Sequence, residues 1–101
     1  MKKQTPWGPS QGEEILAEGI ISYSTAGHGG IWLSPERRKA LPPAKNFLGS
    51  KEWWEEDCDW AVPYLFFSAD IKAYGRAYEF EMNLEAARKT VEAYHPEFKI
   101  G

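Results

Sequence analysis

The sequence predicts an α+β fold, in which a small antiparallel β-meander packs with three to four α-helices. Short β-type runs separated by turn residues fill residues 13–33. Apolar residues recur at helical spacing over much of residues 34–101. Because 101 residues suffice for one hydrophobic core but not for two, we expect a single domain over residues 1–101.

Residues 1–12 predict an irregular lead-in segment. Two prolines and two glycines surround Trp7, and regular elements tolerate such a composition poorly. We therefore expect no helix or strand here, with the Trp7 indole pinning the segment to the rest of the domain.

The meander predicted for residues 13–33 consists of two consecutive hairpins. Ala17-Glu18-Gly19 separates Ile15–Leu16 from Ile20–Tyr23, and this spacing suits a tight turn. The second strand runs into a glycine-rich loop at residues 27–30, and Ile31–Leu33 forms the third strand.

A short helix is predicted to begin at Ser34. The serine is a good N-cap, Pro35 suits the first helical position and Glu36 places an acid in the first turn. Prolines at 42 and 43 stop this helix after Leu41, and residues 45–50 are expected to form a loop.

Residues 52–67 predict a second helix that is kinked or broken near its end. Trp54, Cys58, Ala61 and Leu65 recur at the spacing of one helical face. Pro63 lies inside the pattern, where it removes a backbone donor, so we expect a kink or break there.

Residues 68–82 allow two interpretations. In the first, Ser68 caps a helix whose apolar face carries Ile71, Tyr74, Tyr78 and Met82, although Gly75 can end that helix early. In the second, residues 78–82 form a strand, because apolar and acidic residues alternate there.

The last predicted helix begins with Asn83 as its cap and ends at His95-Pro96. Its outer face carries two oppositely charged pairs at i,i+4 spacing, Glu85 with Lys89 and Arg88 with Glu92. One face is apolar and is predicted to pack on the core: Leu84, Ala87, Val91 and Tyr94.

Composition and charge exclude several classes of function. The net charge is −3, and five acids with no base lie between Glu52 and Asp59, so a general nucleic-acid-binding surface is not expected. A single cysteine allows no disulfide within the chain, and no apolar run is long enough to span a membrane. We therefore expect a cytoplasmic protein.

The glycine-rich loop is the first candidate site. Glycines permit positive φ and a close approach of ligand to backbone, so consecutive amides can bind an anion. Hydroxyls and an imidazole at the same rim would add donors. The alternative is a plain glycine-rich hairpin loop in which the histidine has no role. The residues of this candidate site are Ser24, Thr25, Gly27, His28, Gly29 and Gly30.

The acidic and aromatic stretch at residues 53–60 is the second candidate site. Carboxylates between aromatic planes suit a cationic or hydrogen-bonding ligand, such as a base or a ring amine. An inward-facing acid would need a partner such as Arg37 or Arg38. The alternative is a solvated acidic helix face with Trp54 and Cys58 in the core.

Catalysis is less expected than binding. Cys58 and His28 with a nearby acid would make a nucleophile and base, but Cys58 falls on the apolar stripe and five acids oppose its ionisation. Only His28 and His95 are available as imidazole ligands. We therefore predict no catalytic residue, no metal site and no cofactor.

Several blocks of the sequence resemble an uncharacterised family of small domains carried by tailed phages and bacterial mobile elements. The blocks are Thr5–Pro9, Ser24–Gly30 with Leu33, Ser34 and Arg37, Trp54–Trp60, Ala87–Thr90 and Tyr94–Pro96. Residues 67–82 and Pro63 depart from the family pattern. The resemblance implies a phage origin and a bacterial host cytoplasm, and it implies no established activity.

These observations lead to three functional hypotheses. The first is a non-catalytic phage protein that counters host defence by sequestering a small anionic nucleotide-like ligand, and we expect a homo-oligomer with pockets between its protomers. The second is an acidic module that inhibits a host defence protein, and the third is a small hydrolase that uses His28 or Cys58. Besides the six loop residues, the predicted ligand-binding residues are Trp32, Arg37, Trp54, Glu55, Asp59 and Trp60.

Overall fold

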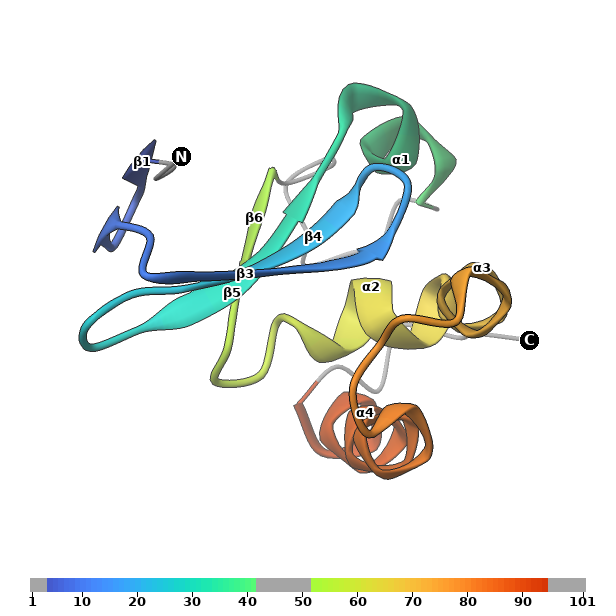
Figure 1. The fold of residues 1–101 in the computed structure, drawn as a ribbon. Coiled ribbons are helices and arrows are strands. Elements are labelled where there is room, and N and C mark those ends of the chain that lie inside the picture. Colours follow the sequence, from blue (N-terminus) through green and yellow to red (C-terminus); the bar gives the residue numbers. More distant parts are fainter. Residues whose placement is uncertain (1–3, 42–51, 95–101) are drawn as a thin grey trace.

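The computed structural model describes residues 4–41 and 52–94 and has an α+β fold, as the sequence predicts (Figure 1). In chain order the elements are β1 (Gln4–Thr5), β2 (Gly8–Pro9), β3 (Gly12–Ala17), β4 (Ile20–Ser24), β5 (Gly29–Leu33), α1 (Pro35–Ala40), β6 (Trp53–Glu55), α2 (Ala61–Phe66), α3 (Ser68–Tyr74) and α4 (Phe80–Tyr94).

The main sheet is antiparallel and has four strands in the order β3-β4-β5-β6. The predicted hairpin of β3 and β4 is confirmed, with Gly19 in its turn at a φ of +81°. β5 pairs with β4 on one side and with β6 on the other, so it is a central strand. The predicted three-stranded meander is therefore extended by a fourth strand from later in the chain.

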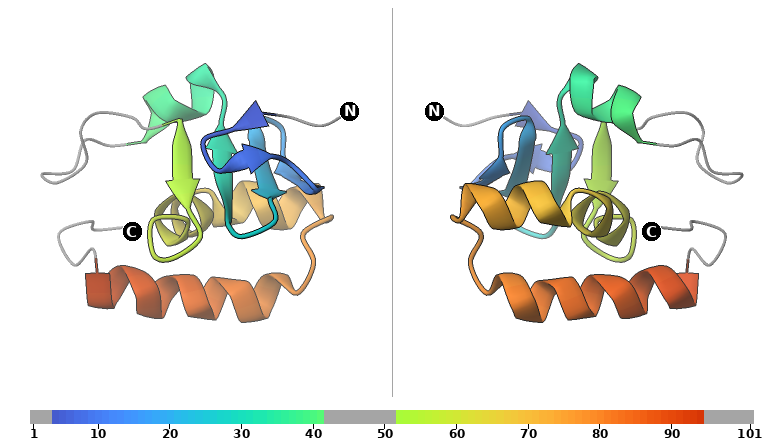
Figure 2. Two further views of the ribbon diagram at one scale, coloured as in Figure 1. Left: turned by 90° about the vertical axis from the view of Figure 1, so that its left-hand side faces the viewer. Right: turned by 90° about the vertical axis from the view of Figure 1, so that its right-hand side faces the viewer.

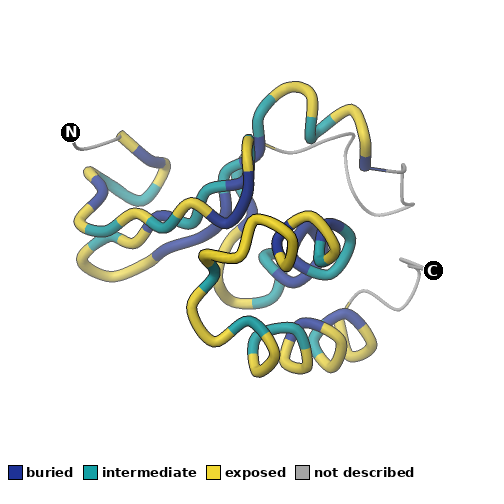
Figure 3. Tube along the Cα trace, turned by 45° about the vertical axis from the view of Figure 1, so that its right-hand side comes forward, coloured by how far each residue is buried: buried dark blue, intermediate teal, exposed yellow. Residues whose placement is uncertain are grey.

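Helices α2, α3 and α4 form two further layers beneath this sheet. α2 and α3 lie against one face, and α4 packs on the side of α2 that faces away from the strands (Figures 1 and 2). Buried residues run through the middle of the sheet, through α2 and along one side of α4 (Figure 3). The largest fully buried side chains are Trp54, Ile20, Leu33, Ile71, Val62 and Pro63.

Helix α1 begins as the sequence predicts. The Ser34 side chain accepts a hydrogen bond from the Arg37 amide at 3.3 Å, and Pro35 occupies the first helical position. Leu41 is the last residue described in this part of the chain. The stop predicted at the two prolines and the loop predicted at residues 45–50 lie outside the described residues.

The helix predicted over residues 52–67 is wrong in its first half. Residues 53–55 form strand β6, which pairs with β5, so Trp54 is buried among strand neighbours. The two tryptophans have a high β propensity, and the unpaired edge of β5 supplies hydrogen-bond partners that outweigh the helical spacing. Helix α2 starts only at Ala61, so Pro63 lies in its first turn, where its missing N–H has no intrahelical partner to lose.

The lead-in segment contains a small hairpin that the sequence did not predict. β1 and β2 pair as a two-stranded antiparallel sheet, and the Thr5 hydroxyl donates to the Gly8 carbonyl at 2.7 Å. Trp7 at its tip packs edge-on against Trp53, with ring centroids 5.7 Å apart. This contact is consistent with Trp7 holding the segment against the sheet.

The structure resolves the two interpretations of residues 68–82 in favour of two helices. α3 ends at Gly75, which has a φ of +75°, and α4 begins at Phe80. Phe67 rather than Ser68 is the N-cap of α3, and Asn83 lies inside α4, so both predicted caps are wrong.

The predicted apolar faces are only partly confirmed. Ile71, Ala87 and Val91 are buried, whereas the described part of the chain leaves several large side chains exposed there. These exposed residues are Tyr74, Tyr78, Met82 and Tyr94. On the outer face of α4 an ion pair at i,i+3 spacing joins Arg88 and Glu85, with 3.7 Å between Nη1 and Oε2.

Within residues 4–41 and 52–94, none of the helices has the length and apolar character needed to cross a membrane.

Candidate functional site

A pocket of about 260 Å³ lies between the main sheet and the helices. The strands β3, β4 and β5 form one wall, and α2, α4 and the turn after β6 form the other. Its lining mixes acids, hydroxyls, aromatic rings and aliphatic side chains: Glu14, Leu16, Ser22, Tyr23, Ser24, Gly30, Ile31, Glu56, Trp60, Tyr64 and Asn83.

The register of the sheet explains why several of these residues meet. Glu14 pairs with Ser22, and Ser22 pairs with Ile31, so the three form one row across the strands. Paired residues point to the same face of an antiparallel sheet. In the next row on this face Ser24 pairs with Gly29, whose carbonyl accepts from the Glu56 amide at 3.0 Å.

Glu14 is held in place by the linker between α3 and α4. Its Oε2 atom accepts a hydrogen bond from the Tyr78 amide at 2.8 Å. The Asn83 side chain in turn donates to the Tyr78 carbonyl at 3.1 Å. These two bonds fix the Glu14 carboxylate at one side of the pocket.

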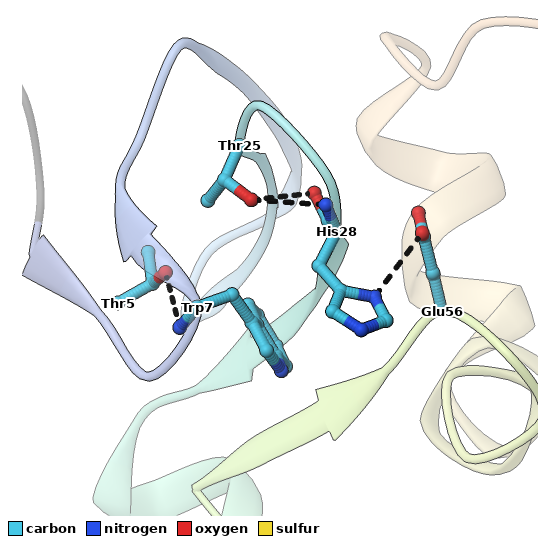
Figure 4. Close-up of polar contacts among 5 residues, drawn as sticks. All are labelled: Thr5, Trp7, Thr25, His28 and Glu56. Atoms are coloured by element: carbon cyan, nitrogen blue, oxygen red, sulfur yellow. Dashed lines mark hydrogen bonds and ion pairs between the residues drawn. The ribbon is translucent and has the colours of Figure 1, made fainter.

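Glu56 lies beside the β4–β5 loop and faces His28. The distance between His28 Nδ1 and Glu56 Oε1 is 3.6 Å, and both side chains are about half exposed (Figure 4). A Cβ atom at Gly29 would come within 3.1 Å of Glu56 Oε2. Glycine at this position therefore leaves space for the carboxylate.

Tyr64 is the most deeply buried polar side chain of the pocket lining. The residue is 3% exposed, and its hydroxyl has no hydrogen-bond partner among the described residues. Burial raises the pKa of the phenol above its usual 10.0, the nearby Asn83 amide opposes this shift and the Glu14 charge adds to it. The phenol is consequently neutral at physiological pH.

The loop that holds His28 is closed by its own hydrogen bonds. The Thr25 hydroxyl accepts from the His28 amide at 3.1 Å (Figure 4), and the Thr25 amide donates to the His28 carbonyl at 2.7 Å. The Thr25 hydroxyl also donates to the His28 carbonyl at 2.9 Å. The Trp7 ring lies beside the imidazole, with centroids 6.3 Å apart.

The reason predicted for the glycines of this loop is wrong. Gly27, Gly29 and Gly30 do not have positive φ, and Gly29 and Gly30 belong to the central strand β5. A Cβ atom at Gly30 would collide with the Trp54 carbonyl and the Trp7 ring. These two strand glycines therefore permit close packing within the sheet, and their backbone does not form the predicted open anion-binding turn.

The structure places some of the other predicted residues away from the pocket. Trp32 and Glu55 project from the opposite face of the sheet, where Trp32 Nε1 donates to Glu52 Oε2 at 2.8 Å. Trp54 is in the core. Of the second candidate site, only Trp60 and Glu56 line the pocket, and Glu56 was not among the individually predicted residues.

Arg37 makes its contacts at the other end of the sheet. Its Nε atom donates to the Glu18 carbonyl at 2.9 Å, in the turn between β3 and β4. Its guanidinium also pairs with Asp70 and stacks on Phe67. The β3–β4 turn and the His28 loop lie at opposite ends of β4, so Arg37 and His28 do not share a site.

The arrangement gives little support to thiol chemistry. The Cys58 sulfur lies 3.7 Å from Asp59 Oδ1, and a neighbouring carboxylate opposes formation of the thiolate. His28 faces Glu56. In residues 4–41 and 52–94, no cluster of three or more His, Cys, Asp or Glu side chains has the arrangement of a metal site.

Sequence reasoning missed Glu14, Ser22, Tyr64 and Asn83 as pocket residues. One signal was present for Glu14 and Ser22, because polar residues at alternate positions of two paired strands share a face. No local signal identifies Tyr64 or Asn83, since their positions depend on how α2 and α4 pack beneath the sheet.

Comparisons with known proteins identify a family but no relative of known structure. Neither the curated proteins nor the solved structures contain a match to the chain. A family model with the description "Domain of unknown function (DUF7007)" matches residues 1–99, which is nearly the whole sequence. The chain therefore belongs to this family of uncharacterised domains.

Proposed function

We propose that this protein is a non-catalytic binding protein that holds a small ligand in the pocket between its sheet and its helices. The observation that carries the proposal is the pocket itself, whose lining combines charged and polar side chains with the aliphatic side chains of Leu16 and Ile31. Apolar walls with a few fixed polar groups are the usual composition of a ligand site.

The lining of the pocket favours a ligand with a flat ring. Trp60 and Tyr64 line it with two aromatic rings, whose centroids are 5.5 Å apart. Aromatic rings attract other rings in stacked or edge-on geometry. The volume of about 260 Å³ lies just below the usual range for drug-sized ligands, so the ligand is small or only its ring enters.

The biological setting of the proposal comes from the resemblance to phage-borne domains. Sequestration of a nucleotide-like signal in the cytoplasm of an infected bacterium would counter host defence without catalysis. In that case the pocket suits the base of the nucleotide, because its rings and hydrogen-bonding groups are those that contact bases in other proteins. Assembly into a homo-oligomer stays a prediction.

The test is a ligand screen against a blocked pocket. Nucleobases, nucleosides, nucleotides and small ring compounds are added to the purified protein, and melting temperature and heat of binding are measured. A true ligand increases the free energy of unfolding by RT ln(1 + [L]/Kd), and this stabilisation raises the melting temperature. Ser24→Trp should abolish this increase by filling the pocket, because Ser24 lines it and is exposed.

The matched control is Ala26→Trp, which adds the same ring to an exposed position of the same loop outside the pocket lining. It should bind the ligand as the unmodified protein does. The proposal is wrong if no compound binds, or if binding survives Ser24→Trp.

A second candidate function is favoured by the exposure of the acidic stretch. Glu52, Glu55, Glu56 and Asp57 are exposed, and Asp59 is half-buried. Exposed acids with no base among them suit a basic surface on a host protein. In infected cells, the double change Glu55→Lys and Asp57→Lys would then abolish the inhibition of host defence. The control double change Glu81→Lys and Glu85→Lys on α4 would not abolish it, and neither would the pocket change Ser24→Trp.

A further inference from the structure

We propose that the ligand of this pocket is a small organic cation with a flat ring, held by the carboxylates of Glu14 and Glu56. This inference rests on the proposed binding function and specifies the charge of what is bound. It replaces the anionic nucleotide-like ligand, because that expectation depended on consecutive open loop amides, whereas the Thr25 and His28 amides are already bonded within the loop.

The charge of the lining is the first argument. Glu14 and Glu56 line the pocket, and among residues 4–41 and 52–94 its lining includes no lysine, arginine or histidine, with His28 facing Glu56 from the loop beside it. An anion entering this space would meet two carboxylates, whereas a cation would gain two charge-assisted hydrogen bonds.

The positions of the two carboxylates are the second argument. Glu14 comes from β3 and Glu56 follows β6, and these strands are the opposite edges of the sheet. Glu14 Oε2 is occupied by the Tyr78 amide, which orients the carboxylate. Glu56 Oε1 faces His28, and Oε2 lies over Gly29. The two groups are thus held on different sides of one space by separate contacts.

Tyr64 supplies an observation that does not depend on the acids. The Tyr64 residue is 3% exposed, and its hydroxyl has no protein partner within hydrogen-bond distance in the described part of the chain, an arrangement that is costly for a buried hydroxyl. Tyr64 lines the same pocket. A ligand with several N–H groups can give its hydroxyl a partner and can also reach a carboxylate.

Benzamidinium and benzoate provide a direct test of the charge. Both have a benzene ring with a planar head group of similar size, but at pH 7 the first is a cation and the second an anion. We expect benzamidinium to raise the melting temperature and benzoate to leave it unchanged, with titration calorimetry giving the dissociation constants. Binding should weaken as salt is added.

Glutamine variants test which carboxylates bind the cation. Glu14→Gln and Glu56→Gln should each weaken benzamidinium binding about tenfold or more, because each loses a charge-assisted hydrogen bond. Glu13→Gln and Glu55→Gln are the controls, since these acids are next in sequence but point to the opposite face of the sheet. Both controls should bind within about twofold of the unmodified protein. Circular dichroism checks that all four variants fold.

The outcomes separate this inference from the proposed function. One outcome is that benzoate or another anion binds, that Ser24→Trp prevents this binding and that benzamidinium does not bind. In that case the cation inference is wrong and the proposed binding function stands. Benzamidinium binding that is equal in Glu14→Gln, Glu56→Gln and both controls also overturns the inference. If neither probe binds and the ligand screen is empty, both proposals fail.

Discussion

At the scale of single residues, three neighbouring glycines have different roles. A Cβ atom at Gly30 would collide with Trp54 and Trp7, and one at Gly29 would lie 2.8 Å from the Tyr23 carbonyl. A Cβ atom at Gly27 would meet nothing within 4 Å. The spacing of these glycines in the sequence is compatible with a binding turn. Close contacts with other elements instead explain why positions 29 and 30 are glycine.

Gly30→Ala should therefore destabilise the protein and Gly27→Ala should not. The added methyl group at position 30 must displace the Trp54 backbone or the Trp7 ring, and overpacking of this kind costs about 1–3 kcal/mol. Neither glycine has positive φ, so no backbone strain complicates the comparison. Urea unfolding measures both variants, and equal stabilities would contradict the packing explanation.

At the scale of elements, local signals succeed where an element makes its own contacts. Ser34, Pro35 and Glu36 predict α1 because a cap and a first turn involve only neighbouring residues. The same reasoning fails at Ser68, where Phe67 is the N-cap of α3 and makes no side-chain capping bond. A serine before a helical pattern indicates the region in which a helix starts. The packing of the helix decides which residue in that region is the N-cap.

Ser34→Ala should lower the free energy of unfolding by about 1 kcal/mol, because it removes the acceptor for the Arg37 amide. Ser68→Ala is the matched control and should change stability by less than about 0.5 kcal/mol, since Ser68 does not cap α3. Thermal and urea unfolding of both variants check this. A larger loss for Ser68→Ala would show that the assignment of caps is wrong.

At the scale of the whole molecule, Arg37 connects three segments that are distant in sequence. It extends from α1 to the Glu18 carbonyl in the β3–β4 turn and to Asp70 and Phe67 on the α2–α3 side. The guanidinium is therefore a structural tie between the sheet and the helical layer, at the end of the sheet opposite to the pocket.

Arg37→Met should lower stability by about 1 kcal/mol and leave benzamidinium binding unchanged. The loss comes from the hydrogen bond to Glu18 and the stacking on Phe67, because the Asp70 ion pair is partly exposed and screened by salt. Lys39→Met, at an exposed position of the same helix, is the control. Loss of ligand binding in Arg37→Met at full stability would instead place Arg37 in the site.

Part of the candidate site was predictable from sequence and part was not. Three of the predicted site residues line the pocket, namely Ser24, Gly30 and Trp60. His28 lies beside the pocket, where it faces the lining residue Glu56. Arg37, Trp54 and Glu55 are directed elsewhere by the sheet register and by α1. Glu14, Tyr64 and Asn83 reach the pocket from three elements that are far apart in the chain.

The sequence by itself determined the α+β class, the β3–β4 hairpin and the start of α1, because turns, caps and alternation are interactions between near neighbours. Only the tertiary structure decided that residues 53–55 are a strand and that Glu14 and Glu56 share a pocket. The physical reason is that strand pairing and helix packing join residues far apart in sequence, and these contacts outweigh local preference.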